Sequence, residues 1–235
     1  MRPKAPDLAT GKLPDPLPAD PLPLLIAWFD EANRNAACPN PNAVALATAT
    51  PNGLPSVRMV LCKAIEPLHG SALFFTNYTS RKAAELEANP HAAAVFHWDH
   101  AARQARLEGV VTRTSEAESD AYFASRPLLS QLGAWASQQS QPIDARFKLL
   151  DRLGSVMARF GVGTLDDPSV RVPRPSHWGG YRLWLTSVEL WMGADYRLHD
   201  RATWSRSLVP HPDAVTQGEP VPFHPSAWTA TRRQP

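Results

Sequence analysis

Short segments with strand character, separated by turn signals, recur along this sequence and limit the folds that it can adopt. Residues 43–50 (AVALATAT) are followed by Pro51-Asn52-Gly53, after which residues 54–63 (LPSVRMVLCK) form a second such segment. Two strand-like segments around an Asn-Gly pair predict a β-hairpin. Further strands are expected over residues 71–77, 91–98, 103–113, 181–191 and 196–205.

Helices are expected between these strands. Asp20-Pro21 is typical of a helix start, and the apolar spacing that follows predicts a helix over residues 21–36. Ser115 and Glu118 form a capping-box pattern that predicts a helix to about Ser125. The remaining helices are expected over residues 80–87, 127–137 and 144–160. The predicted class is therefore mainly β with inserted helices (α+β), a small barrel carrying helical excursions, rather than a parallel βαβ sheet.

Proline marks the segments that we expect to lie outside the regular structure. The chain has 24 prolines, and they are dense in residues 1–19, which we interpret as a flexible N-terminal arm. Residues 208–226 are also rich in proline and lack periodicity, so a surface loop is expected there. The rest of the chain, residues 20–235, is interpreted as a single domain.

Charge and cysteine content exclude several classes of protein. A net charge of +2 gives no global field that would favour nucleic acid, so an anion site must come from local clusters of Arg and Lys. Cys38 and Cys62 are too few for a disulfide framework, and the eight His show no metal-ligand spacing. Met1-Arg2-Pro3-Lys4 has no apolar run behind it, which argues against a signal peptide, and no stretch is long enough to cross a bilayer. We expect a cytoplasmic protein without a metal or a membrane partner.

The segment TNYTSRK (76–82) places two cations at a predicted helix start. Ser80 is the expected cap, and Arg81 and Lys82 lie in the first turn, where positive charge opposes the helix dipole. Cations there are favourable when an anion docks on the free amides of the same turn. The segment therefore predicts a phosphate site, with a solvated pair of surface charges as the alternative.

Two other clusters of polar residues can be explained either by ligand binding or by a structural role. Arg58 and Lys63 bound a strand and lie on its opposite faces, so one can face a ligand, although edge charges that limit aggregation are the favoured interpretation. Tyr122, Arg126 and Ser130 are each four residues apart and suit a second phosphate site. Because Pro127 interrupts their helix, a helix corner capped by Arg126 is an equal alternative. The polar pair Gln139-Ser140 is by itself best explained as a helix cap.

A third cluster, RLHDR (197–201), is dense in groups that bind anions. In a strand, Arg197, His199 and Arg201 would share one face, and burying two cations beside a His is costly unless an anion is present. An exposed edge strand is the alternative. Trp191 lies across the predicted hairpin, where it can stack on a flat ring or belong to the core. Together the clusters predict two anion sites and an aromatic platform, which suit flat phosphorylated ligands.

Six motifs, in their order along the chain, resemble the pyridoxamine 5′-phosphate oxidase family. They are RMVLCK (58–63), FTNYTSRK (75–82), RQARLEG (103–109), YFASRPLLSQLGAWAS (122–137), SHWGGYRL (176–183) and LWMGADYRLHDR (190–201). The resemblance runs from Leu17 to about Arg206, with a weaker similarity over residues 228–235. It implies an FMN-binding split β-barrel and a homodimer with FMN at the subunit interface.

The resemblance also implies roles for individual residues. FMN contacts are expected from Arg58, Met59, Val60, Leu61, Cys62, Lys63, Phe75, Thr76, Arg81, Lys82, Gln104, Gln139, Ser140, Trp191 and Arg201. Substrate contacts are expected from Lys63, Tyr122, Arg126, Ser130, Arg197 and His199. Arg197 and His199 are the candidate catalytic residues, which would position the reacting carbon over the flavin, and neither is assigned as an essential base.

The implied reaction is FMN-dependent oxidation of pyridoxamine 5′-phosphate or pyridoxine 5′-phosphate to pyridoxal 5′-phosphate, with oxygen reduced to hydrogen peroxide. A related flavin oxidase of phenazine biosynthesis is one alternative, and a non-catalytic module that binds FMN or pyridoxal phosphate is another. Tyr122, Arg126 and Ser130 favour the vitamin substrate, because a phosphate needs such a site. Phe75 replaces a frequent family tyrosine, so any contact there is expected through its backbone, and the chain ends in RRQP where the family ending is more apolar.

Overall fold

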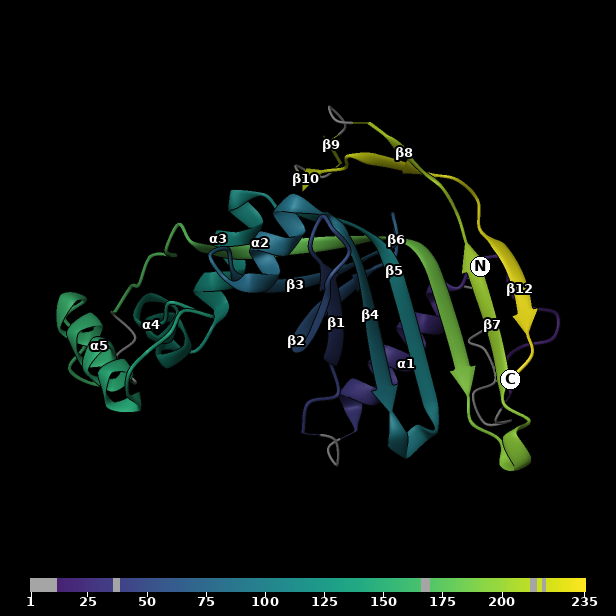
Figure 1. Cartoon of the computed structure of the whole chain (residues 1–235), viewed down its shortest axis with the longest axis horizontal. Helices are drawn as coiled ribbons and strands as arrows, with labels where there is room; N and C mark the ends of the chain where they lie inside the picture. Colours follow the sequence, from purple (N-terminus) through teal and green to yellow (C-terminus); the bar gives the residue numbers. More distant parts are fainter. Residues whose placement is uncertain (1–11, 36–38, 166–169, 212–214, 217–218) are drawn as a thin grey trace.

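Eight antiparallel strands form one sheet, and six of them close into a barrel (Figure 1). The computed structural model describes residues 12–35, 39–165, 170–211, 215–216 and 219–235. The sheet order is β12-β7-β6-β3-β2-β1-β4-β5, and an additional β5–β6 pairing closes the barrel. The strands are β1 (Ala43–Ala49), β2 (Pro55–Glu66), β3 (Ser71–Asn77), β4 (His91–Trp98), β5 (Arg103–Arg113), β6 (Trp178–Met192), β7 (Asp200–Ser205) and β12 (Thr229–Arg233). The predicted class, mainly β with inserted helices, is confirmed.

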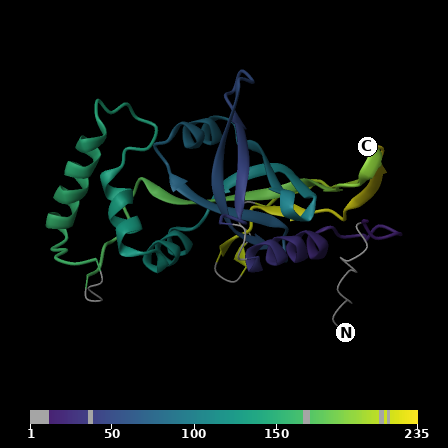
Figure 2. The same cartoon turned by 90° about the horizontal axis from the view of Figure 1, so that it is seen from below.

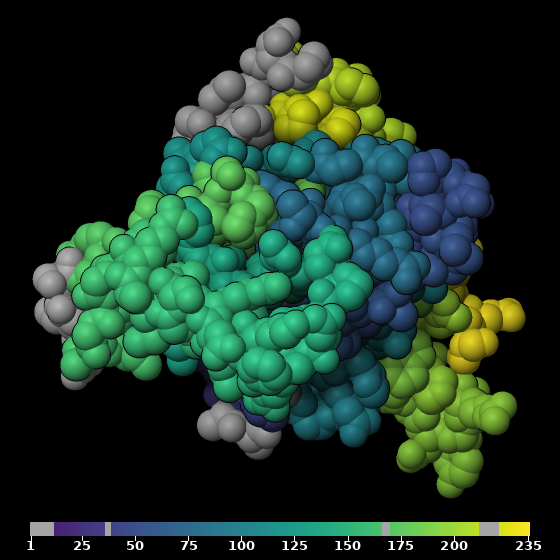
Figure 3. All heavy atoms as spheres, turned by 60° about the vertical axis from the view of Figure 1, so that its left-hand side comes forward, coloured from purple at the N-terminus to yellow at the C-terminus, as the bar shows by residue number. Residues whose placement is uncertain are grey.

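The described residues include five α-helices, which lie close to the positions that the sequence predicts. They are α1 (Leu22–Arg34), α2 (Arg81–Ala88), α3 (Glu116–Ser125), α4 (Leu128–Ala136) and α5 (Arg146–Arg159). Helix α1 packs along the barrel through Trp28 and Phe29, whose rings contact Trp98 and Phe96 of β4. Helices α3 to α5 lie together at one end of the long strand β6, away from both described chain ends (Figures 1 and 2). Figure 3 shows this helical region standing in front of the barrel.

The protein has two apolar cores, which match these two regions. The larger core fills the barrel, because alternate residues of each strand point inward, as the buried positions of β1 and β5 show. The smaller core lies among α3, α4, α5 and the start of β6, and its buried members are Phe123, Leu132, Val162, Val172 and Trp178. No helix in the described part of the chain is long and apolar enough to cross a membrane.

Strand β2 is shared between two neighbours, and this splits the barrel wall. Its residues 55–61 pair with β1, whereas residues 62–66 pair with β3. The register shifts between Cys62 and Ala64, as at a β-bulge. The first half of β2 therefore diverges from β3, and the divergence opens the barrel on the side of α2 and α4.

Some segments that were expected to be irregular are ordered against the sheet. Leu13 is buried, and its backbone N–H donates to Asp200 Oδ2 at 2.9 Å. The Trp204 indole donates to the carbonyl of Pro18 at 2.7 Å. Residues 13–18 of the expected flexible arm thus pack on β7, while residues 1–11 lie outside the described part. The expected loop at 208–226 contains two short ladders, β8 (Leu208–Pro210) with β11 (Phe223–Pro225) and β9 (Val215–Thr216) with β10 (Glu219–Pro220).

The strand expected to begin at Tyr196 begins at Asp200. Residues Asp195–Arg197 form a 3₁₀ turn, η3, in which Tyr196 and Arg197 have φ angles of 57° and 62°. This left-handed conformation is incompatible with a strand. The prediction that Arg197 shares a strand face with His199 and Arg201 is therefore wrong. Cys62 is buried, and Cys38 lies outside the described residues.

Candidate active site

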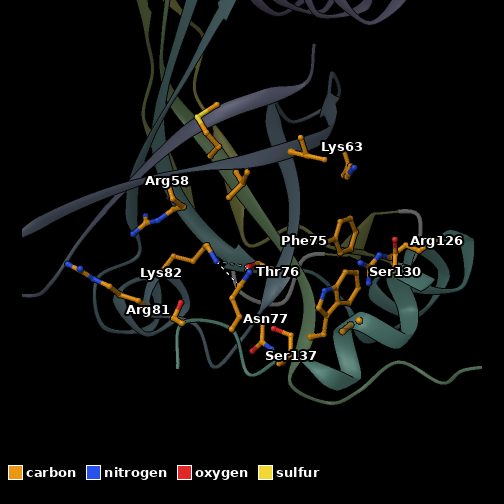
Figure 4. A pocket seen from close by; sticks show the side chains of 18 of the residues that line it. Arg58, Lys63, Phe75, Thr76, Asn77, Arg81, Lys82, Arg126, Ser130 and Ser137 are labelled. Atoms are coloured by element: carbon orange, nitrogen blue, oxygen red, sulfur yellow. Dashed lines mark hydrogen bonds between the residues drawn. The ribbon is translucent and has the colours of Figure 1, made fainter. Parts of the chain in front are cut away.

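A cavity of about 950 Å³ opens where β2 diverges from β3. Its walls come from β2, β3, the start of α2, the corner between α3 and α4, and the segment after α4 (Figure 4). This volume suits a small-molecule site, for which roughly 300–1,000 Å³ is usual. The sequence-predicted residues that line it are Arg58, Met59, Val60, Leu61, Lys63, Phe75, Thr76, Arg81, Lys82, Tyr122, Arg126, Ser130, Gln139 and Ser140.

Lys82 is the buried cation at one end of the cavity. Its Nζ donates to Thr76 Oγ1 at 2.9 Å, to Gln139 Oε1 at 2.9 Å and to Ser80 Oγ at 3.2 Å. Burial, together with the nearby charge of Arg58, lowers the pKa of Lys82 to about 8. These neutral partners orient the ammonium group but leave its charge without compensation.

A buried carboxylate, Glu85 of α2, organises the arginines at the same end. It accepts hydrogen bonds from Thr48 and Ser56 at 2.5 Å each, from Arg81 Nε at 2.8 Å and from Arg58 Nη2 at 3.2 Å. Burial alone would raise the pKa of Glu85, but these hydrogen bonds outweigh it and hold the pKa at about 2. Three cations and one carboxylate leave two positive charges, which suit a phosphate dianion.

The opposite end of the cavity holds a second cationic group (Figure 4). Arg126 and Ser130 lie there, together with Lys63, whose Nζ is 5.7 Å from the centroid of the Tyr122 ring. Burial lowers the pKa of Arg126, and its Nη1 is buried without a hydrogen-bond partner among the described residues. A buried, unpaired guanidinium nitrogen is costly, so this end of the cavity is suited to an anion.

Stacked aromatic rings line the part of the cavity wall that connects the two ends. Phe75 lies parallel to Tyr122 with ring centroids 3.9 Å apart, and parallel to Trp178 at 5.5 Å. Strand β6 approaches this wall through Gly179 and Gly180. A Cβ on Gly179 would lie 2.1 Å from the Tyr78 hydroxyl, and one on Gly180 would lie 2.8 Å from the Phe75 ring, so neither position tolerates a side chain without rearrangement.

Most of the other predicted residues lie away from this cavity in the structure of the single chain. Gln104 and Arg201 each pair with Trp191 across β5, β6 and β7, and the rings of Trp191 and His199 are 4.7 Å apart. This group lies at the β6–β7 turn, at the far end of the sheet from α4 (Figure 1). Arg197 is exposed on η3 beside it.

The surroundings of Arg201 and Cys62 differ from those of the residues that line the cavity. Arg201 pairs with buried Glu189 at 2.7 Å, yet its Nε is buried without a partner among the described residues. Cys62 is expected among the cofactor contacts, but its side chain lies in the barrel core, where burial raises the pKa of the thiol to about 12.

Glu85 and Trp178 were not predicted as site residues. The spacing of Arg81 and Glu85, four apart on one helix, is a signal for an ion pair but not for its burial beneath a cavity. Trp178 directly precedes Gly179-Gly180, and only the fold shows that its ring lies against Phe75.

A split barrel whose cavity has two cationic ends, separated by stacked rings, defines a protein that binds flat, phosphorylated molecules. The chain belongs to the pyridoxamine 5′-phosphate oxidase family. Residues 30–152 match that family, and residues 178–235 match the pyridoxine 5′-phosphate oxidase C-terminal dimerisation region. The resemblance seen in the sequence motifs is thereby confirmed.

Curated relatives support the same assignment. A pyridoxine/pyridoxamine 5′-phosphate oxidase of Gluconobacter oxydans is 48% identical over 191 residues, which are 81% of this chain and 90% of the relative. The protein of the same name from Bordetella avium is 53% identical over 183 residues, 78% of this chain and 81% of the relative. The chain is therefore an oxidoreductase of this family.

Solved structures share the fold. PhzG from Burkholderia lata 383, in complex with tetrahydrophenazine-1-carboxylic acid, has a TM-score of 0.76 and 28% identity, covering 94% of this chain and 95% of that one. A pyridoxamine 5′-phosphate oxidase-related, FMN-binding protein from Nostoc punctiforme has a TM-score of 0.65 and 18% identity, covering 92% and 98%. The latter similarity shows the fold alone, and the expected split barrel is confirmed.

Proposed function

We propose that the protein oxidises pyridoxine 5′-phosphate or pyridoxamine 5′-phosphate to pyridoxal 5′-phosphate, using FMN as cofactor and oxygen as electron acceptor, with hydrogen peroxide as the second product. The observation that carries the proposal is a single cavity with two separate cationic ends. Two phosphorylated ligands bind there with their flat rings together and their phosphates apart. The names of the curated relatives support pyridoxine or pyridoxamine 5′-phosphate as one of the two ligands, and FMN is proposed as the other.

The FMN phosphate is assigned to the end formed by Arg58, Arg81 and Lys82. This end has the start of α2, where free backbone amides add to the side-chain donors. The substrate phosphate is assigned to Arg126, Ser130 and Lys63, because the unpaired Arg126 Nη1 needs an acceptor. Bound FMN supplies the hydride acceptor, and the residues of the chain bind, orient and shield the reactants.

The protein is proposed to act as a homodimer, because its outer surface has complementary apolar features. Val57, Met59 and Leu61 of β2 border the cavity and are 68%, 63% and 39% exposed, so they form an apolar ridge along its edge. Beside the ridge lies a depression of about 450 Å³ between β1, β4 and β5, lined partly by small residues such as Ala47 and Ala93. A two-fold partner can place its ridge in this depression, which agrees with the family's dimerisation region.

The dimer also accounts for the second group of predicted residues. Gln104, Trp191 and Arg201 lie on the outer surface of the sheet, and Tyr196 and Leu198 of the adjoining turn are 93% and 73% exposed. Large exposed apolar side chains are typical of contact surfaces. The partner subunit is proposed to bring its copy of this group over the cavity, so that its Arg197 and His199 position the substrate.

The test is an oxidation assay on the purified protein reconstituted with FMN. Pyridoxine 5′-phosphate and pyridoxamine 5′-phosphate should each yield pyridoxal 5′-phosphate and one equivalent of peroxide. Unphosphorylated pyridoxine should react far less well, because it lacks the group that Arg126 binds. FMN binding without turnover of either phosphate ester would contradict the proposal and favour a non-catalytic module, or a flavin oxidase with another substrate.

A further inference from the structure

Arg126 differs from the other arginines with partly or largely buried side chains in having neither an ion pair nor a hydrogen-bond acceptor among the described residues. Arg206 also lacks an ion pair in the described residues, but its guanidinium donates to the carbonyls of Leu185, His69 and Gly70. Five arginines with largely buried side chains each pair with at least one carboxylate: Arg58, Arg103, Arg174, Arg182 and Arg201. Arg126 has no ion pair and no side-chain hydrogen bond in the described part of the chain. Its guanidinium carbon lies instead 4.6 Å from the centroid of the Trp178 ring and 5.5 Å from that of Phe123.

Trp178 is itself held in a fixed orientation. It is 7% exposed, pairs with Asn77 in the β3–β6 ladder, and its carbonyl accepts a hydrogen bond from Arg174 at 2.5 Å. Its ring is nearly parallel to that of Phe75, with 10° between the planes. The indole is therefore a rigid platform, which lines the cavity at the end where Arg126 and Ser130 lie.

We infer that Trp178 is a positioning residue for the substrate phosphate, because its indole ring holds the Arg126 guanidinium in the place that a carboxylate takes at the five ion-paired arginines. The inference rests on the proposed function. An aromatic face attracts a guanidinium through its ring quadrupole, and indole does so most strongly. The indole ring has no hydrogen-bond acceptor atom, so it leaves the N–H donors of the guanidinium free for an anion.

The aromatic partner also keeps the charge of Arg126 uncompensated. A carboxylate at this position would neutralise the cation and occupy two of its donors before any ligand arrived. At the other end of the cavity, Glu85 does this for Arg58 and Arg81. The two ends therefore differ in charge compensation. The end proposed for the FMN phosphate is partly neutralised by Glu85, whereas Arg126, at the end proposed for the substrate phosphate, has no carboxylate partner in the described residues. Preference for phosphorylated over unphosphorylated vitamers depends on Trp178 through Arg126.

The experiment measures equilibrium binding of two analogues to the FMN-loaded enzyme, so its readout does not depend on turnover. The analogues are 4-deoxypyridoxine 5′-phosphate, which lacks the oxidisable group, and 4-deoxypyridoxine, which also lacks the phosphate. The variants are Trp178→Leu and the conservative Trp178→Phe. Trp135→Leu is the matched control, because the Trp135 ring also lies 4.6 Å from an arginine, Arg159, but does not line the cavity.

We expect Trp178→Leu to weaken binding of the phosphorylated analogue by roughly tenfold. Binding of the unphosphorylated analogue should stay unchanged, Trp178→Phe should restore part of the loss, and Trp135→Leu should have no effect. In the Arg126→Ala background, Trp178→Phe should cause no further loss, since Trp178 acts through Arg126.

Two results separate failure of the inference from failure of the proposed function. If the unmodified enzyme binds both analogues equally, the proposed function is wrong. If it prefers the phosphorylated analogue and Trp178→Phe and Trp178→Leu keep that preference, the inference is overturned while the proposed function stands. Equal losses for both analogues, or a further loss from Trp178→Phe without Arg126, would also overturn it by showing a general packing role.

Discussion

Lys82 carries a charge that its surroundings disfavour in the absence of an anion. Its pKa is lowered to about 8 by burial and by Arg58, so the apoprotein releases this proton as the pH rises through about 8. A bound dianion favours the charged form and raises the pKa, so FMN binding above pH 8 should take up a proton. Affinity should therefore fall as the pH increases from 7 to 9.

Fluorescence titration of the apoprotein with FMN measures this dependence. Lys82→Met should weaken binding by about 1.5–3 kcal/mol at pH 7, the usual contribution of a charge-assisted hydrogen bond, and should flatten the pH profile. Lys148→Met, which removes a surface lysine paired with Asp144, should change neither. Parallel pH profiles for the unmodified protein and Lys82→Met would show that Lys82 does not face the phosphate.

At the residue scale, the sequence predicted the groups that carry charge better than the groups that orient them. Arg81 and Lys82 were predicted because cations at a helix start conflict with the local dipole. Glu85 was not, because its role depends on Thr48 and Ser56, which lie 37 and 29 residues away along the chain. Trp178 was missed for a similar reason, since the ring and its partner Arg126 come from different elements.

Helix α3 carries Tyr122 and ends directly before Arg126, and its start is fixed by one side chain. The backbone N–H of Glu118 donates to Ser115 Oγ at 3.0 Å, as the capping-box pattern predicts. The Glu118 carboxylate pairs with Arg182 at 2.8 Å, which ties the helix to β6. Ser115→Ala should therefore destabilise the protein by about 1 kcal/mol.

Denaturant unfolding measures this change as a lower midpoint with an unchanged slope. Ser155→Ala is a suitable control, because it removes a hydroxyl from the exposed interior of α5 and should be neutral or slightly stabilising. A midpoint unaffected by Ser115→Ala would mean that water replaces the cap without loss.

At the scale of elements, strands with alternating burial were predicted to within a few residues, whereas the β6–β7 connection was not. The sequence YRLH (196–199) alternates like a strand and contains no glycine to mark a turn. Two hydrogen bonds hold the turn. The long-range one runs from the Gly193 N–H to the carbonyl of Ala102 at 2.7 Å, and the local one from the Ala194 N–H to His199 Nδ1 at 3.1 Å. The local bond encloses Tyr196 and Arg197, whose positive φ angles are disfavoured by local propensity.

At the scale of the whole molecule, the depression between β1 and β4 is the place to test assembly. Ala47 lies there, on the outer face of β1. Ala47→Arg should be tolerated by the isolated chain, because the side chain can extend into open space, but it should block the ridge of a partner. We expect a folded monomer with greatly weakened FMN binding, against a dimer for the unmodified protein.

Light scattering gives the mass, and circular dichroism shows whether the fold is kept. Ala121→Arg is the matched control, because it places the same side chain at an exposed position of α3, none of whose residues lines the depression. A dimer that persists in Ala47→Arg would exclude this surface as the interface.

The two faces of β2 also link cofactor binding to correct folding of the chain. Arg58 points toward Glu85, while Val57 and Met59 point outward, and β1 fixes this by pairing Leu46 with Arg58. A slip of one residue would turn every side chain of β2 to the wrong face. Such a chain would lose an arginine of the phosphate site and the apolar ridge together. If FMN binds at this site as proposed, the yellow colour per unit of protein should follow the fraction of chains in the native register, even in a variant that has lost all turnover.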